Sequence, residues 1–194
     1  MLIASDIDDV LLDLIPAIIE FHNRRYCTNL TKERFHSYRL GEVFDCSDEE
    51  ANRRMREFFE TEEFRDVQPL EDAVEGVMAL KERGYDFIAL TSRLLSCRRI
   101  TEGNIEKYFP GIFTGRVYLA TNHYLRKLSS PKSKGTYCLE LRVDVMIDDS
   151  ITHAEECRDL GIKALLMDSL HNRRKTPQGI ARVRNWQEIM EYFK

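Results

Sequence analysis

Three carboxylates stand close together near the start of this chain, where Asp6, Asp8 and Asp9 directly follow the apolar run Met1 to Ser5. Like charges this close repel one another, and folding alone gives no reason to group them. A carboxylate cluster is typical of a site that holds a cation, because Mg²⁺ and Ca²⁺ prefer oxygen ligands. The segment therefore indicates a site for a hard divalent metal ion.

A second acid pair, Asp148 and Asp149, ends the apolar run Val145 to Ile147. Parallel α/β sheets collect their ligands at the carboxyl ends of the strands, so the two acidic segments can meet at one site. The alternative is that these residues cap helices and form turns after strands. Capping accounts for one acid at each strand end but not for pairs at both, and we favour a shared metal ion.

Four side chains, Asp6, Asp8, Thr91 and Lys134, follow predicted strands or begin predicted helices and could serve one reaction on a phosphate. A carboxylate can attack phosphorus and form an aspartyl-phosphate, provided that Mg²⁺ offsets the repulsion between the two anions. A second carboxylate two residues on can give a proton to the leaving alcohol and later take one from water. A hydroxyl can bind a phosphate oxygen, and a lysine can balance the accumulated charge.

Some of these positions have rivals along the chain. Lys132 lies two residues from Lys134, which we favour because of its spacing to Asp148. Ser92 could bind substrate with a second hydroxyl or cap the next helix. Arg93 could reach a phosphate or lie on the surface.

Apolar strand-like runs alternate with helical patterns, which predicts an α/β fold: a Rossmann-like, doubly wound parallel sheet covered by helices on both faces. Strands are expected over residues 2–6, 85–90, 116–120, 143–147 and 163–167. Helices are expected over residues 15–26, 71–83, 96–108, 133–141, 151–160 and 186–193.

The stretch 28–67 differs from this alternation, because it is charged, rich in Phe and Arg, and lacks a β-branched run. Ser47 followed by Glu50 forms a capping-box signature for a helix that ends near Phe59. We therefore expect a small helical cap over residues 14–68, inserted after the first strand of a core formed by residues 1–13 and 69–194.

Aromatic side chains in this insertion could contact a flat substrate. Phe21, Tyr38 and Phe44 could stack on it, although aromatics at helical spacing more often pack in a core. The histidines at positions 22, 36 and 123 show no pattern of a metal triad. The basic segment 171–179 is either a loop over the site or a surface connection.

Composition restricts the partners. The formal net charge of −4 over 194 residues gives no general footprint for a nucleic-acid polymer. No apolar run approaches the ~18 residues of a membrane span. Five scattered cysteines without CxxC spacing suit reduced thiols and a cytoplasmic location. A homodimer stays open, because a partner subunit could cover a site that a small cap leaves exposed.

The segments Asp6-Ile7-Asp8-Asp9, Leu90-Thr91-Ser92, Lys134 and Ile147-Asp148-Asp149 resemble, in this order, the four motifs of the haloacid dehalogenase (HAD) superfamily. The resemblance extends over nearly the whole chain. The short insertion after the first motif resembles the small cap of the 5′-nucleotidase branch, the cytosolic deoxyribonucleotidase-like proteins. One departure is Asp9, which stands where many relatives carry glycine.

The resemblance implies a role for each matching residue. Asp6 would be the nucleophile and a metal ligand, and Asp8 the acid/base with its backbone carbonyl on the metal. Asp148 would be the third metal ligand, with Asp149 acting through water. Thr91 and Lys134 would bind the phosphate, helped by Ser92.

The expected function is that of a Mg²⁺-dependent phosphomonoester hydrolase that works through an aspartyl-phosphate. Its small phosphorylated substrate is expected to be a nucleoside 5′-monophosphate, or else another phosphorylated metabolite. Two further hypotheses stay open: a phospho-acceptor protein, in which the lysine would follow the last acid, and a phosphotransferase without net hydrolysis.

Overall fold

The computed structural model describes residues 1–122, 125–173 and 176–194 and contains one six-stranded parallel sheet with the strand order β3-β2-β1-β4-β5-β6. The strands are β1 (Leu2–Ser5), β2 (Asp86–Thr91), β3 (Tyr118–Leu119), β4 (Val145–Asp148), β5 (Lys163–Met167) and β6 (Ala181–Val183). The chain winds outward from β1 to β3, returns to β4 beside β1, and winds outward again to β6. This order confirms the predicted doubly wound fold and makes the β1–β4 border its switch point.

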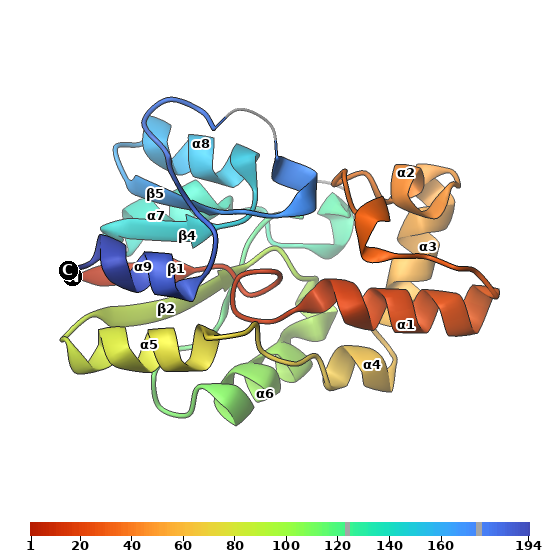
Figure 1. Cartoon of the computed structure of the whole chain (residues 1–194), viewed down its shortest axis with the longest axis horizontal. Helices are drawn as coiled ribbons and strands as arrows, with labels where there is room; N and C mark the ends of the chain where they lie inside the picture. The colour runs from red at the N-terminus through yellow and green to blue at the C-terminus, as the bar shows by residue number, and fades with distance from the viewer. Residues whose placement is uncertain (123–124, 174–175) are drawn as a thin grey trace.

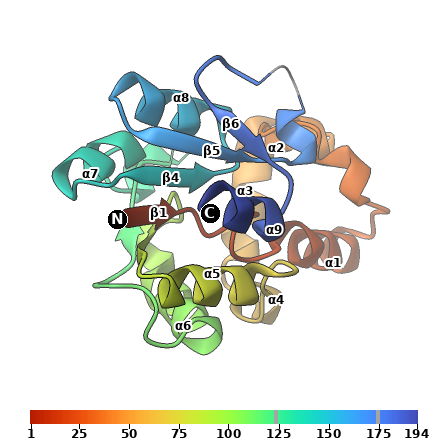
Figure 2. The same ribbon diagram turned by 60° about the vertical axis from the view of Figure 1, so that its left-hand side comes forward.

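Helices cover both faces of the sheet (Figures 1 and 2). One face carries α5 (Ala73–Glu82), α6 (Arg98–Tyr108) and α9 (Trp186–Tyr192), and the other carries α7 (Lys134–Glu140) and α8 (Ile151–Asp159). Single 3₁₀ turns are η1 (Lys32–Arg34), η2 (Leu95–Cys97), η3 (Arg126–Leu128) and η4 (Leu170–Asn172). The predicted helices of the core are thus confirmed, with small shifts at their ends.

Two hydrophobic cores form because side chains alternate between the faces of each strand. Ile3 and Val145 point into the core under α5, α6 and α9, whereas Ala4 and Met146 point into the core under α7 and α8. Strands buried on both faces read as continuous apolar runs, which made them recognisable in the sequence. The β6 strand was not predicted, since its three residues include Arg182 and acquire strand structure by pairing with β5.

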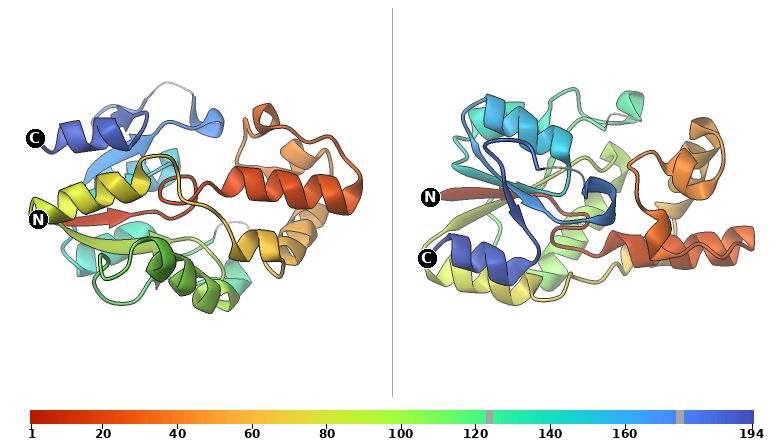
Figure 3. Two further views of the ribbon diagram at one scale, coloured as in Figure 1. Left: turned by 60° about the horizontal axis from the view of Figure 1, so that its bottom comes forward. Right: turned by 45° about the horizontal axis from the view of Figure 1, so that its top comes forward.

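The segment 14–68, between β1 and α5, contains four α-helices that lie beyond the carboxyl ends of the strands (Figure 1). These helices are α1 (Leu14–Tyr26), α2 (Leu40–Phe44), α3 (Asp48–Phe58) and α4 (Glu62–Arg65). Both chain termini lie at the opposite end of the molecule (Figure 3). Ser47 caps α3 by accepting a hydrogen bond from the Glu50 N–H at 3.2 Å. The Glu50 carboxylate pairs with Arg53 and Arg54 instead of closing the predicted box.

The loop that follows β1 is hydrogen-bonded to the C-terminal helix α9. The Trp186 indole Nε1 donates a hydrogen bond of 2.7 Å to the Val10 carbonyl. Trp186 packs closely on Gly76 of α5, where an added Cβ would lie 2.9 Å from Trp186 Cε3. A glycine in α5 therefore lets α9 approach and support the acidic loop.

Candidate active site

The two acidic segments meet at the switch point of the sheet. Asp6 directly follows β1, and its N–H donates to the Ile147 carbonyl of β4 at 2.9 Å. Asp148 is the last residue of β4. Carboxylate oxygens of Asp6, Asp148 and Asp149 lie within 4.8 Å of one another, and all three residues are buried. Parallel pairing of β1 with β4 thus brings together acids that are far apart in sequence.

Lys134 begins α7 and is buried beside these acids. Its Nζ lies 2.7 Å from Asp6 Oδ2 and 2.7 Å from Asp148 Oδ2. Lys132 is half exposed and pairs with Glu140 at 2.7 Å. Of the two lysines that the sequence offered, the structure places Lys134 in the acid cluster.

The cluster carries more negative than positive charge. Burial works to raise the pKa of Asp148, but the Lys134 ammonium and His153 hold it below its usual value. Burial raises the pKa of Asp6 well above 3.8; Lys134 opposes this shift, and the neighbouring Asp148 and Asp149 add to it. One buried lysine cannot balance all of these carboxylates. The surplus of buried oxygen ligands fits a hard divalent cation.

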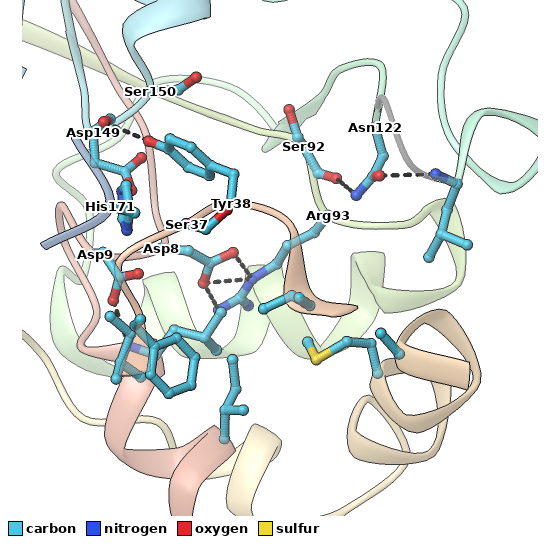
Figure 4. Close-up of a pocket in the computed structure, with 18 of the residues that line it drawn as sticks. Asp8, Asp9, Ser37, Tyr38, Ser92, Arg93, Asn122, Asp149, Ser150 and His171 are labelled. Atoms are coloured by element: carbon cyan, nitrogen blue, oxygen red, sulfur yellow. Dashed lines mark hydrogen bonds and ion pairs between the residues drawn. The ribbon is translucent and has the colours of Figure 1, made fainter. Parts of the chain in front are cut away.

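The Asp8 side chain is not part of this trio. It pairs with Arg93 (Figure 4). The Arg93 guanidinium donates from Nη2 to Asp8 Oδ1 at 2.6 Å and from Nε to Oδ2 at 3.0 Å. Arg93 is only 3% exposed. Of the two alternatives offered by the sequence, the surface position is therefore wrong: Arg93 is buried and pairs with Asp8 at the border of the cavity. No local pattern identifies such a pair, because the partners come from different strand ends.

Thr91, Ser92 and Asn122 line the pocket beside Asp8. Thr91 is the last residue of β2, and its Oγ1 accepts a hydrogen bond from the Arg93 N–H at 3.2 Å. Asn122 donates from Nδ2 to the Ser92 carbonyl at 3.0 Å (Figure 4). Sequence reasoning did not single out Asn122, which lies in an irregular loop without a motif.

Asp9 has a structural role, and its backbone conformation is one that glycine adopts readily. Its backbone lies in the left-handed region at φ 56°, which short polar residues tolerate better than most. Its Oδ1 accepts a hydrogen bond from the Leu14 N–H at 3.2 Å, at the start of α1. Burial, followed by the charge of Asp149, raises the Asp9 pKa.

Asp149 is held by residues from two other segments (Figure 4). His171 Nε2 lies 2.8 Å from Asp149 Oδ2. The Tyr38 hydroxyl donates a hydrogen bond to the Asp149 carbonyl. The centroids of the Tyr38 and His171 rings lie 4.0 Å apart. The first residue of the segment 171–179 therefore reaches the site. Residues 174–175 of that segment lie outside the described residues.

A cavity of about 390 Å³ lies between the insertion and the acidic strand ends. Its floor contains Asp6, Asp8, Thr91 and Ser92. Its wall on the insertion side is largely apolar and consists of Leu14, Ile15, Ile18, Phe35, Leu40, Met55 and Phe59.

Of the aromatics considered from sequence, Tyr38 lines this cavity. Phe21 and Phe44 are buried in the insertion, where Phe44 stacks on His22 at 4.3 Å between ring centroids. Phe21 and Phe44 therefore pack in the core, which is the role that their spacing favoured. Neither Phe35 nor Phe59 was singled out from sequence.

The histidines form no separate metal site among the residues that the structure describes. His22 is hydrogen-bonded to Thr28 at 2.8 Å and faces Arg54, and His36 is exposed. His123 lies outside the described residues.

Comparison with known proteins identifies the family. Residues 1–130 match the family described as 5′ nucleotidase, deoxy (pyrimidine), cytosolic type C, or NT5C. The chain belongs to the NT5C family. A nucleotidase of Clostridium acetobutylicum is 25% identical over 190 residues, which are 96% of this chain and 90% of that protein.

Solved structures show the same HAD fold. A haloacid dehalogenase-like hydrolase of Streptococcus pneumoniae has a TM-score of 0.72 at 15% identity and matches 100% of this chain and 98% of its own. A protein of Bacillus subtilis assigned to the HAD hydrolases, solved with magnesium bound, has a TM-score of 0.67 at 13% identity, with 100% and 98% coverage. This NT5C member is thus an HAD-type hydrolase of phosphoric monoesters. Among its described residues, no helix has the length and apolar character needed to cross a membrane.

Proposed function

We propose that this protein is a Mg²⁺-dependent phosphatase that hydrolyses nucleoside 5′-monophosphates through an aspartyl-phosphate on Asp6. The observation that carries the proposal is the position of Asp6. Its buried carboxylate lies at the switch point, beside Lys134 and two further acids, on the floor of a substrate-sized cavity. The acid-rich surroundings suit a nucleophile that works with a cation.

The proposed reaction has two steps. A carboxylate oxygen of Asp6 attacks phosphorus, the bond to the leaving oxygen breaks, and Asp8 gives that oxygen a proton. Water then attacks the phosphorus of the aspartyl-phosphate while Asp8 takes a proton from it, the bond between phosphorus and the Asp6 oxygen breaks, and inorganic phosphate leaves the regenerated Asp6 carboxylate. Throughout, Lys134 and the hydroxyls of Thr91 and Ser92 hold the phosphate oxygens.

The residues present fit Mg²⁺. Asp6, Asp148 and Asp149 supply buried carboxylate oxygens, and the Asp8 backbone carbonyl follows two residues after Asp6. When bound there, the ion would neutralise the charge that otherwise repels an anionic substrate. The sequence-based expectation had Asp149 acting through water, whereas its carboxylate lies in the same compact group as those of Asp6 and Asp148.

A nucleotide suits the cavity in size and character. About 390 Å³ lies within the range of small-molecule sites, ~300–1,000 Å³. Phe35, Met55 and Phe59 offer an apolar wall for a flat base, above a polar floor for the phosphate. The nucleotidase relatives support the same substrate class. We further propose that the helices over residues 14–68 act as the cap that selects the substrate; the homodimer and the cytoplasmic location stay predictions.

Phosphate release tests the proposal directly. Nucleoside 5′- and 3′-monophosphates, sugar phosphates and 4-nitrophenyl phosphate are compared with Mg²⁺ and with EDTA, beside the Asp6→Asn variant. We expect Mg²⁺-dependent release that favours 5′-monophosphates and is absent in Asp6→Asn. Release from sugar phosphates alone would contradict the nucleotide assignment. Transfer of phosphate to an added alcohol, without free phosphate, would favour the phosphotransferase hypothesis.

A further inference from the structure

Arg93 is the most deeply buried cation near the cavity after Lys134, and the reaction proposed above does not use it. Its side chain is 2% exposed and that of Asp8 is 22% exposed. The guanidinium is therefore more completely covered than the carboxylate, and both residues border the cavity (Figure 4). Arg93 borders the cavity, and its guanidinium donates hydrogen bonds to Asp8 and to side chains of α6.

The contact fixes the orientation of the Asp8 carboxylate. Asp8 Oδ1 accepts from Nη2 at 2.6 Å and from Nε at 3.1 Å, whereas Oδ2 accepts from Nε alone at 3.0 Å. A guanidinium presents its donors in a rigid plane, so contact with both oxygens restricts rotation of the carboxylate. Oδ2 keeps more room to exchange a proton with a group in the cavity.

Arg93 is itself held by two helices. Its Nη1 donates to Thr101 Oγ1 at 3.2 Å and to Asn104 Oδ1 at 3.5 Å, both on α6. Its Cζ lies 4.6 Å from the centroid of the Phe64 ring on α4, a cation–π distance. Asn104 Nδ2 donates in turn to the Arg65 carbonyl of α4 at 2.8 Å. The guanidinium therefore connects Asp8 of the core to α4 of the insertion.

We infer that Arg93 is a positioning residue, which orients the Asp8 carboxylate toward the leaving oxygen. Contacts with Phe64 and Asn104 fix the position of the guanidinium. The inference rests on the acid/base role proposed for Asp8. It assigns to α4 a contribution to proton transfer, in addition to any contact that the insertion makes with the substrate. Arg93 itself acts through Asp8.

Two leaving groups of similar shape isolate this role. Phenyl phosphate and 4-nitrophenyl phosphate differ in how much their leaving oxygen needs a proton, since the nitro group stabilises the departing anion. The ratio of kcat/KM for the two substrates reports proton donation in the first step, because kcat/KM excludes the later attack of water. A variant that merely loosens the fold lowers both values alike.

The test compares Arg93→Met, Arg93→Lys and Asp8→Asn with the wild-type protein in Mg²⁺. We expect Arg93→Met to lower kcat/KM for phenyl phosphate about tenfold more than for 4-nitrophenyl phosphate, part of the ~10²–10⁴ that a positioned acid provides. Arg93→Lys keeps the charge but not the two-pronged contact, and it should fall between. In Asp8→Asn, adding Arg93→Met should change the ratio no further, because the two residues act as a unit.

A matched pair of phenylalanines tests the connection to α4. Phe64→Leu removes the ring that contacts Arg93, whereas Phe58→Leu alters an equally buried neighbour for which no Arg93 contact is found. We expect Phe64→Leu to shift the substrate ratio by about threefold, in line with a cation–π contact. Phe58→Leu should leave the ratio unchanged.

The outcomes separate the role of Arg93 from the proposed function. Equal losses on both substrates in folded Arg93→Met would overturn the inference, as would an unchanged rate. Should Arg93→Met fail to fold, equal ratios for the two phenylalanine variants would overturn it. Absence of Mg²⁺-dependent hydrolysis in the wild-type protein, or an unaltered ratio in Asp8→Asn, would instead contradict the proposed function.

Discussion

The Lys134 ammonium lies 2.7 Å from Asp6 Oδ2, although one residue begins α7 and the other follows β1. Both side chains are buried, and Asp148 Oδ2 lies 2.7 Å from the same nitrogen. Two buried carboxylates thus share one cation. Removing the ammonium group would therefore leave both carboxylates without this partner.

Replacing Lys134 should damage both activity and stability. Lys134→Met leaves two buried carboxylates without their partner, and breaking such a pair costs about 3–5 kcal/mol of unfolding free energy. Loss of one group that stabilises developing charge should lower kcat by about 10²–10³. Phosphate release and chemical denaturation in EDTA measure the two effects.

Lys132→Met is the matched control. Its half-exposed pair with Glu140 should contribute no more than about 1 kcal/mol. Near-normal activity of Lys134→Met, or a comparable loss in Lys132→Met, would contradict the position assigned to Lys134.

The metal-free protein should lose stability as pH rises. The folded-state pKa of Asp6 is raised above 3.8, so its contribution is complete below that value and disappears as pH rises through the folded pKa. Asp9 acts in the same direction. The lowered pKa of Asp148 matters only at pH below 3.8. Thermal unfolding in EDTA from about pH 4.5 to about pH 8 measures the trend.

Mg²⁺ should oppose this loss, because the proposed site would bind the ion through deprotonated Asp6 and a ligand of the folded state stabilises it. The increase in Tm on adding Mg²⁺ should therefore grow with pH. In Asp6→Asn the pH dependence in EDTA should be weaker, and its turnover should be abolished. Identical pH slopes for the two proteins would contradict the assigned shift.

Asp9 should matter for backbone geometry and not for chemistry. Asp9→Asn keeps a side-chain oxygen for the Leu14 N–H and tolerates φ 56°, so we expect a stability close to that of the wild-type protein. Asp9→Ala loses the hydrogen bond to the Leu14 N–H and replaces a residue that tolerates the left-handed region with one that tolerates it less well, which should cost about 1–2 kcal/mol. Denaturation curves of both variants decide; a larger loss in Asp9→Asn than in Asp9→Ala would reverse the interpretation.

Two helical glycines should respond oppositely to alanine. In Gly76→Ala the new Cβ meets Trp186 at 2.9 Å, and the indole is tied to Val10, so overpacking should cost about 1–3 kcal/mol. At Gly103, in α6, an added Cβ has nothing within 4 Å. Gly103→Ala should therefore gain about 0.5–1 kcal/mol from helix propensity. Equal shifts in Tm would mean that the close approach of α5 and α9 is not needed.

Much of the fold could be predicted because its signals are local. Buried parallel strands appear as apolar runs, helices show their period, and Ser47 marks the start of α3. The acid pairs also lie where they can be recognised, at the ends of two such runs. Since ligands gather at the carboxyl ends of parallel strands, fold class predicted that Asp6 and Asp148 lie at the same edge of the sheet, and the pairing of β1 with β4 makes them neighbours.

Tertiary structure decided the contacts that depend on the path of the chain between elements. Arg93 is a partner of Asp8 because β2 lies beside β1 and α6 closes over its side chain. Tyr38 reaches Asp149 from a loop and His171 reaches it from η4, and neither segment carries a motif. Sequence patterns describe which residues are buried and where strands end. Pairing of side chains from distant segments arises only when strand order and helix packing bring those segments together.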